Sequence, residues 1–234
     1  KKQIQNKITY YEVAYDNKHI IIASAVGHLY GLDEKEKKGW TYPSFDVIWK
    51  PAYDIKKTAA HTKPYLTLLK QLAKKATSFV VATDYDIEGE TIGLNIIKFA
   101  CNQKDAKRMK FSTYTKEELI DSYTHASPHL EWGQAHAGIT RHELDYIYGI
   151  NLSRALSLAI KSTGAFKIMS IGRVQGPALK LIVDKEHEIQ KFVADPYWQI
   201  ELITDKITAW HKEDKIWEKA KAETILKNTQ NGKK

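Results

Sequence analysis

The chain has 234 residues, 43% of them hydrophobic and 27% charged, which is typical of a soluble globular protein of one large domain or two smaller ones. The polar N-terminus has no apolar signal core, which argues against secretion, and no apolar run approaches ~18 residues, which argues against a membrane span. The single cysteine, Cys101, argues against a disulfide framework and favours the cytoplasm. A net charge of +8 favours a polyanionic partner.

The first third of the chain is expected to form strands. Residues 8–15 are rich in β-branched and aromatic side chains, a turn follows at Asp16 and Asn17, and residues 19–24 form a second apolar run. This order predicts a β-hairpin. Residues 32–60 are mixed in character and are expected to be irregular.

The next part alternates between helix and strand. Helices are expected over 65–76, over 88–101 and from a capping box that begins at Thr115, and strands over 78–83 and 108–111. The order predicts an α/β domain with a parallel sheet flanked by helices.

From about residue 131 to 191 nearly every segment has helical character, with breaks expected near Gly149, Gly164 and Gly172. A further hairpin is expected from 197 to 210. The predicted organisation is therefore an α/β domain (1–126), a mainly α-helical domain (127–194) and the start of a β-rich unit (195–234).

Three alternating acidic residues, Asp84, Asp86 and Glu88, follow the apolar strand 78–83. Extended backbone would point them the same way, at the sheet edge where ligands collect. Three convergent carboxylates require a cation, and Mg²⁺ prefers such oxygen ligands. The alternative is helix capping, with Asp86 as the N-cap and Glu88 and Glu90 in the first turn.

Arginines mark a second region, since three of the four lie between 141 and 173. Arg173 and Gln175, after Gly172, could present a guanidinium and an amide to phosphate, or simply form a solvated loop at a helix start. Arg141 and Asp145 have the spacing of a helical ion pair.

Residues 151–154 follow Gly149, and their polar side chains would suit phosphate near a helix start. His28 lies in a loop after a strand, where a structural role is the more common one. The nine histidines show no zinc-binding spacing, so the sequence gives no indication of a zinc site.

The blocks at residues 24–29, 82–90, 108–112 and 170–177 resemble successive blocks of the type IA DNA topoisomerases, especially the archaeal topoisomerase I/III branch. They occur in the family's order, and residues 141–154 resemble the helical segment between them. The resemblance implies a Toprim domain to about residue 126, then a helical domain of the DNA-binding groove and the start of a β-rich gate arch.

The resemblance also implies roles for individual residues. Asp84, Asp86 and Glu88 would be the catalytic acids that hold Mg²⁺ beside the scissile phosphate. His142 stands where many relatives carry arginine. The residues expected to line the single-strand groove are His28, Arg141, His142, Asn151, Arg154, Ser170, Gly172, Arg173 and Gln175.

The reaction implied is relaxation of negatively supercoiled DNA by Mg²⁺-dependent, ATP-independent transesterification and single-strand passage. Two family blocks are not found here: an initial strand with Glu-Lys-Pro and the Tyr-x-Arg-Thr/Ser block with the catalytic tyrosine. We therefore expect an internal segment or one piece of a split, nucleoid-associated topoisomerase, inactive without the part that carries the tyrosine.

Two other functions are consistent with parts of the pattern. Another Toprim enzyme, a primase or nuclease, would share the acidic residues but would not need the 170–177 block. A non-catalytic single-stranded-DNA-binding module would need the basic residues but not the acids, because carboxylates without metal repel phosphate.

Overall fold

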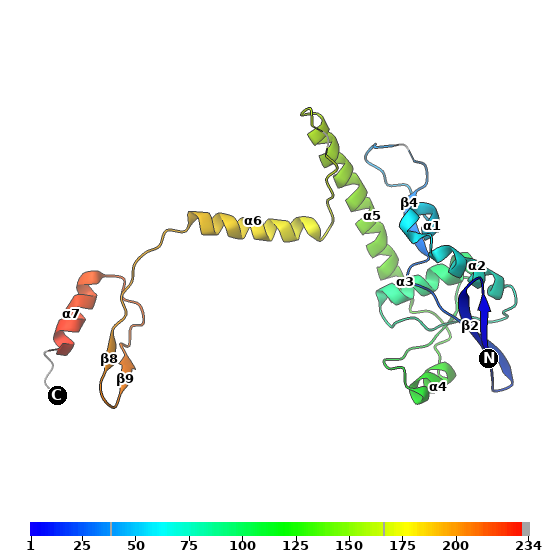
Figure 1. Cartoon of the computed structure of the whole chain (residues 1–234), viewed down its shortest axis with the longest axis horizontal. Coiled ribbons are helices and arrows are strands. Elements are labelled where there is room, and N and C mark those ends of the chain that lie inside the picture. The colour runs from blue at the N-terminus through cyan, green and yellow to red at the C-terminus, as the bar shows by residue number, and fades with distance from the viewer. Residues whose placement is uncertain (38, 166, 231–234) are drawn as a thin grey trace. The chain divides into compact units, whose positions relative to one another are not determined.

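The structure is a computed structural model that describes residues 1–37, 39–165 and 167–230 (Figure 1). Contacts divide the chain into two compact units, Lys1–Gly176 and Pro177–Lys234. Within the described ranges, no helix combines the length and apolar character needed to cross a membrane.

The first unit opens with an antiparallel sheet of β1 (Lys2–Gln5), β2 (Ile8–Tyr15) and β3 (Lys18–Ala23), in that order. Asp16 and Asn17 both have positive φ (51° and 55°), as a two-residue hairpin turn requires. The predicted hairpin is confirmed, and β1 adds a third strand.

A second antiparallel pair, β4 (Tyr30–Glu34) and β5 (Val47–Pro51), lies in the stretch expected to be irregular, so that expectation was wrong there. β4 ends in Asp33 and Glu34, residues depleted from strands, and both are buried. Lys50 and Arg154 pair with them, and such distant partners leave no mark on the local pattern. Short helical segments α1 (Ala52–Ile55) and η1 (Lys57–Ala59) follow.

The expected α/β order is confirmed in the middle of this unit. Helix α2 (Thr62–Ala73) precedes β6 (Val80–Val81), which pairs in parallel with β7 (Lys107–Arg108). Between these strands run α3 (Ile87–Asn95) and its π-helical continuation η2 (Ile96–Ala100). Both strands are shorter than expected. The core beneath α3 consists of Val81, Leu94, Ile97, Ala106, Leu130 and Ala135.

Two further helices complete this unit. Thr115 caps α4 (Lys116–Thr124), as predicted. Helix α5 (Trp132–Lys161) packs against α3 and runs unbroken through Gly149, so the break expected there is wrong. Glycine costs about 1 kcal/mol relative to alanine inside a helix but does not have to end it. The helical run does end before Gly164, whose φ is +89°.

The second unit contains most of α6 (Gln175–Lys191), an antiparallel hairpin of β8 (Glu201–Ile203) and β9 (Thr208–Trp210), and α7 (Lys219–Gln230). The hairpin matches the sequence prediction. Contacts place the chain division after Gly176, and the division into 1–126, 127–194 and 195–234 stays a prediction.

Candidate functional site

The acidic motif forms a tight turn between β6 and α3. Asp86 has extended backbone (φ −145°, ψ 177°), and its carboxylate accepts a 2.7 Å hydrogen bond from the Gly89 amide, which makes it the N-cap of α3. The Thr83 hydroxyl donates to the Gly89 carbonyl at 2.7 Å. A Cβ at residue 89 would lie 2.1 Å from the Asp84 carbonyl oxygen, so only glycine allows this turn.

The extended backbone therefore reaches only as far as Asp86, and Glu88 projects from the first helical turn. The capping alternative describes Asp86 correctly, with Glu88 and Glu90 in the first turn. The assumption that one extended segment would present all three acids is wrong, because the cap starts the helix before Glu88.

A buried arginine supports the acidic turn from behind. Arg108, on β7, is fully buried and donates from Nε to Glu90 at 2.7 Å. Its two Nη atoms donate to the carbonyl oxygens of Thr83 and Asp84 at 2.8 and 2.7 Å. A guanidinium whose position is fixed therefore holds the backbone that presents Asp84. The sequence did not predict this role for Arg108, because the role follows from the burial of its side chain, which only the folded structure shows.

Asp84 itself borders a hollow of about 310 Å³ that is lined by Asp84, Tyr85, Phe111, Ser112 and Tyr114. The Tyr114 hydroxyl donates to Asp84 Oδ1 at 3.3 Å. The hollow leaves room beside the carboxylate for a hydrated ion or a phosphate oxygen.

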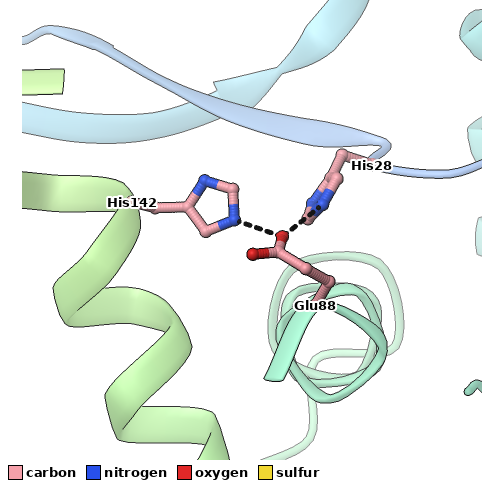
Figure 2. Close-up of side chains that lie close together, drawn as sticks. All are labelled: His28, Glu88 and His142. Atoms are coloured by element: carbon pink, nitrogen blue, oxygen red, sulfur yellow. Dashed lines mark hydrogen bonds and ion pairs between the residues drawn. The ribbon is translucent and has the colours of Figure 1, made fainter. Parts of the chain in front are cut away.

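Glu88 meets two histidines from distant parts of the chain. His28 Nε2 and His142 Nε2 lie 3.1 and 2.9 Å from Glu88 Oε2, as Figure 2 shows. Arg141 Nη1 lies 3.2 Å from the other carboxylate oxygen. One ligand atom from each of His28, Glu88 and His142 lies within 4.8 Å of the others, the only such metal-compatible group among the described residues.

The electrostatics of this cluster favour an ionised Glu88 and a neutral His28. Burial acts to raise the pKa of Glu88, but the hydrogen bond from His142 and the charges of His142, His28 and Arg141 outweigh it and lower the pKa. Burial lowers the pKa of His28, with help from His142 and against the pull of Glu88. The cluster thus stabilises the ionised form of Glu88, while burial disfavours the protonated form of His28.

The expected helical pair of Arg141 and Asp145 is present, at 3.8 Å. Asp145 also accepts a 2.5 Å hydrogen bond from Arg173 Nε. Glu88, Arg141, Asp145 and Arg173 therefore form a continuous line of alternating charges. The Arg173 hydrogen bond is the main cause that lowers the pKa of Asp145.

The sequence suggested that a helix starts near Asn151 and Arg154. Both residues lie in the middle of α5, so that expectation is wrong. Arg154 donates from both Nη atoms to Glu34 at 2.7 Å, and Asn151 bonds the Ser44 backbone. Arg154 also donates to the Thr41 carbonyl at 2.8 Å, so both side chains hold the loop between β4 and β5. Near the end of the first unit, Ser170 and Gln175 are exposed and Gly172 is half-buried.

The parallel β6–α3–β7 unit with its acidic turn has the architecture of a Toprim domain, and a family model described as Toprim domain matches residues 6–114. A second model, described as DNA topoisomerase, matches residues 129–234. Together the two models cover most of the chain.

Similar proteins agree with these models. DNA topoisomerase 1 of Pyrococcus furiosus is 49% identical over 226 residues, which are 94% of this chain and 21% of that protein. DNA topoisomerase 1 of Methanocaldococcus jannaschii is 44% identical over 235 residues, with coverages of 100% and 31%. The solved structure of full-length topoisomerase I from Thermotoga maritima gives a TM-score of 0.61 at 26% identity, over 86% of this chain and 33% of that one.

The chain belongs to the type IA DNA topoisomerase family. It spans about a fifth to a third of the length of these relatives.

Proposed function

We propose that this chain supplies the acidic metal site and part of the single-strand groove of a type IA topoisomerase. The whole enzyme would relax negatively supercoiled DNA by Mg²⁺-dependent, ATP-independent transesterification and strand passage. Its catalytic tyrosine would come from the remainder of the enzyme, covalently continuous or a separate chain. The observation that carries the proposal is the acidic turn that Arg108 holds at the edge of the parallel sheet, beside the alternating charges that include Arg141 and Arg173.

The carboxylates of the turn are of the chemical type that Mg²⁺ prefers, and in this structure the three of them do not lie within 4.8 Å of one another as a group. Asp84, Asp86 and Glu88 offer hard carboxylate oxygens, and Asp84 borders a hollow large enough for a hydrated ion. When bound, Mg²⁺ would supply positive charge at the scissile phosphate. Asp86 would combine this role with its cap of α3, which fixes the start of the helix that carries Glu88.

The arginines would bind the DNA backbone. Arg141 and Arg173 both pair with Asp145, a carboxylate that occupies the place a phosphate would take. Guanidinium forks bind phosphate and carboxylate with similar geometry, so DNA can replace Asp145 as the partner of Arg173. Contacts of this kind hold a single strand by its backbone and leave its base sequence unread.

The DNA-binding surface around Arg141 and Arg173 would extend to Ser170, Gly172 and Gln175. Gly172 would allow the DNA strand to approach the backbone closely. Asn151 and Arg154 would act on the groove through the β4–β5 loop that they bind. Single-stranded regions of supercoiled duplex are the proposed substrate, and the nucleoid in the cytoplasm is the proposed location.

A chimera tests the proposal. This chain would replace the matching segment of the M. jannaschii topoisomerase, to which it is 44% identical. The chimera should relax negatively supercoiled plasmid with Mg²⁺ and without ATP, and the Asp84→Asn form should bind single-stranded DNA but not relax plasmid. The 234-residue chain alone should not relax plasmid. A chimera that binds DNA and folds but never relaxes plasmid would contradict the proposal.

The two alternative functions predict other outcomes. A Toprim primase would make primers from nucleotides, and a nuclease would leave cut strands with free ends. A binding module would keep its full function after Asp84→Asn. The model matched to residues 129–234 favours the topoisomerase.

A further inference from the structure

We propose that His28, Glu88 and His142 form a binding site for a divalent transition-metal ion of the zinc type. This site goes beyond the proposed function, because its ligands are chemically different from the three carboxylates proposed for Mg²⁺. The two sites share only Glu88.

The geometry of the cluster matches the demands of such an ion. Zinc binds nitrogen and oxygen ligands at about 2.0–2.1 Å in a tetrahedron, which places ligand atoms about 3.3 Å from one another. Glu88 Oε2 already lies 3.1 Å from His28 Nε2 and 2.9 Å from His142 Nε2. All three ligand atoms lie within 4.8 Å of one another, so a modest closing of the two imidazoles would bring them to ligand spacing around a common ion.

Both imidazoles approach the same carboxylate oxygen from different sides, as Figure 2 shows. Their ring centroids lie 4.9 Å apart with the planes inclined at 62°. Arg141 holds the other oxygen of Glu88 at 3.2 Å, so the carboxylate would ligate through Oε2 alone. The arrangement is a set of two histidines and one monodentate carboxylate.

The three side chains come from positions fixed by packing. Glu88 projects from the first turn of α3 and His142 from α5, and these helices pack closely where Gly138 meets Thr91. His28 directly precedes Leu29, which is 1% exposed. The ligands therefore need no large rearrangement to bind an ion.

One side of the cluster stays open. The side chains of His28, Glu88 and His142 are 33%, 36% and 31% exposed. A site with three protein ligands leaves a fourth position for water or a phosphate oxygen, the pattern of reactive zinc sites. Imidazole nitrogen favours zinc, cobalt and similar ions over magnesium, so the donor set selects the ion.

Titration of the 234-residue chain with Co²⁺ tests the site, since tetrahedral Co²⁺ absorbs visible light that octahedral aqueous Co²⁺ barely absorbs. We expect one equivalent to bind with such bands, and one equivalent of Zn²⁺ to abolish them. His142→Gln keeps a hydrogen-bond donor near Glu88, so it should fold but bind Co²⁺ at least about 100-fold more weakly, since loss of an outer-shell partner alone costs 10–100-fold. His136→Ala, an exposed histidine on the same helix, should bind like the wild type.

The Asp84→Asn variant distinguishes Co²⁺ binding at this site from metal binding at the proposed Mg²⁺ site. It should leave the Co²⁺ spectrum unchanged, because Asp84 is not in the cluster. Three results would each overturn the inference. They are loss of the bands in Asp84→Asn, survival of the bands in a folded His142→Gln chain, and absence of a tetrahedral band in the wild type. If the chimera relaxes plasmid but the 234-residue chain binds no Co²⁺, the metal site is refuted and the proposed function stands. If the chain binds Co²⁺ but the chimera does not relax plasmid, only the proposed function is refuted.

Discussion

Arg108 and Glu90 are both fully buried and are joined by a 2.7 Å hydrogen bond between Nε and Oε2. The pair ties β7 to α3, and the second oxygen of Glu90 accepts the Glu131 amide at the start of α5 at 2.9 Å. The remaining guanidinium nitrogens hold the acidic turn. One buried ion pair thus connects three elements behind the candidate site.

Arg108→Met should destabilise the protein strongly. It leaves the Glu90 carboxylate buried without its charge partner, and breaking a buried pair in this way costs about 3–5 kcal/mol. Urea denaturation followed by circular dichroism measures the loss. Lys107→Met, at the exposed neighbour on β7, should stay within about 0.5 kcal/mol of the wild type. Equal losses in the two variants would show that the pair has no special role.

Two glycines of α5 should respond oppositely to alanine. A Cβ at Gly138 would lie 2.0 Å from Thr91 Oγ1 and 2.6 Å from the Ile87 carbonyl, so Gly138→Ala must push α5 from α3. Such overpacking costs about 1–3 kcal/mol. Gly133 has open space around its Cβ position, and Gly133→Ala should be neutral or stabilising by up to about 1 kcal/mol. Thermal unfolding of both variants checks this, and a stable Gly138→Ala protein would disprove the close packing.

Glu34 should make the protein sensitive to acid. The hydrogen bond from Arg154 lowers the pKa of Glu34, with help from Ser44, and outweighs the burial that acts to raise it. Because the folded pKa lies below the ordinary value of 4.5, this stabilisation is present above pH 4.5 and is lost as pH falls through the folded pKa.

The free energy of unfolding should therefore fall less steeply below pH 4.5 in Glu34→Gln than in the wild type. Asp46→Asn provides the matched control, because Asp46 is an acidic residue of the loop that follows Glu34, 76% exposed and 3.8 Å from Lys35. Its profile should follow that of the wild type, since exposed pairs contribute little. Parallel profiles for Glu34→Gln and the wild type would contradict the assignment.

Arg173→Ala should weaken binding of single-stranded DNA and reduce the slope of log K against log salt by about 0.7, the value for one lost phosphate contact. Asp145→Asn should strengthen binding, because it removes the carboxylate that pairs with Arg173 at 2.5 Å. Fluorescence anisotropy with a labelled oligonucleotide over a salt series measures both effects. An unchanged slope in Arg173→Ala would mean that this arginine serves only Asp145.

Local patterns were enough to predict much of the framework. Alternating residues and the Asp16–Asn17 turn predicted the β2–β3 hairpin, and Thr115 marked the start of α4. The order of apolar and helical segments predicted the parallel β6–β7 pairing across α3. These features depend on periodicity, caps and turns within a few residues, which is information that the sequence carries directly.

The contacts that build the candidate site depend on the tertiary structure. His28 and His142 reach Glu88 across 60 and 54 residues of sequence, and Arg154 reaches Glu34 across 120. No motif spacing encodes these approaches, because each partner comes from a different element. The sequence by itself determined the β2–β3 hairpin, the order of β6, α3 and β7, and the positions of the acids along the chain. Packing of α3 against α5 decided which side chains surround Glu88, because only close packing brings distant groups to within hydrogen-bonding distance.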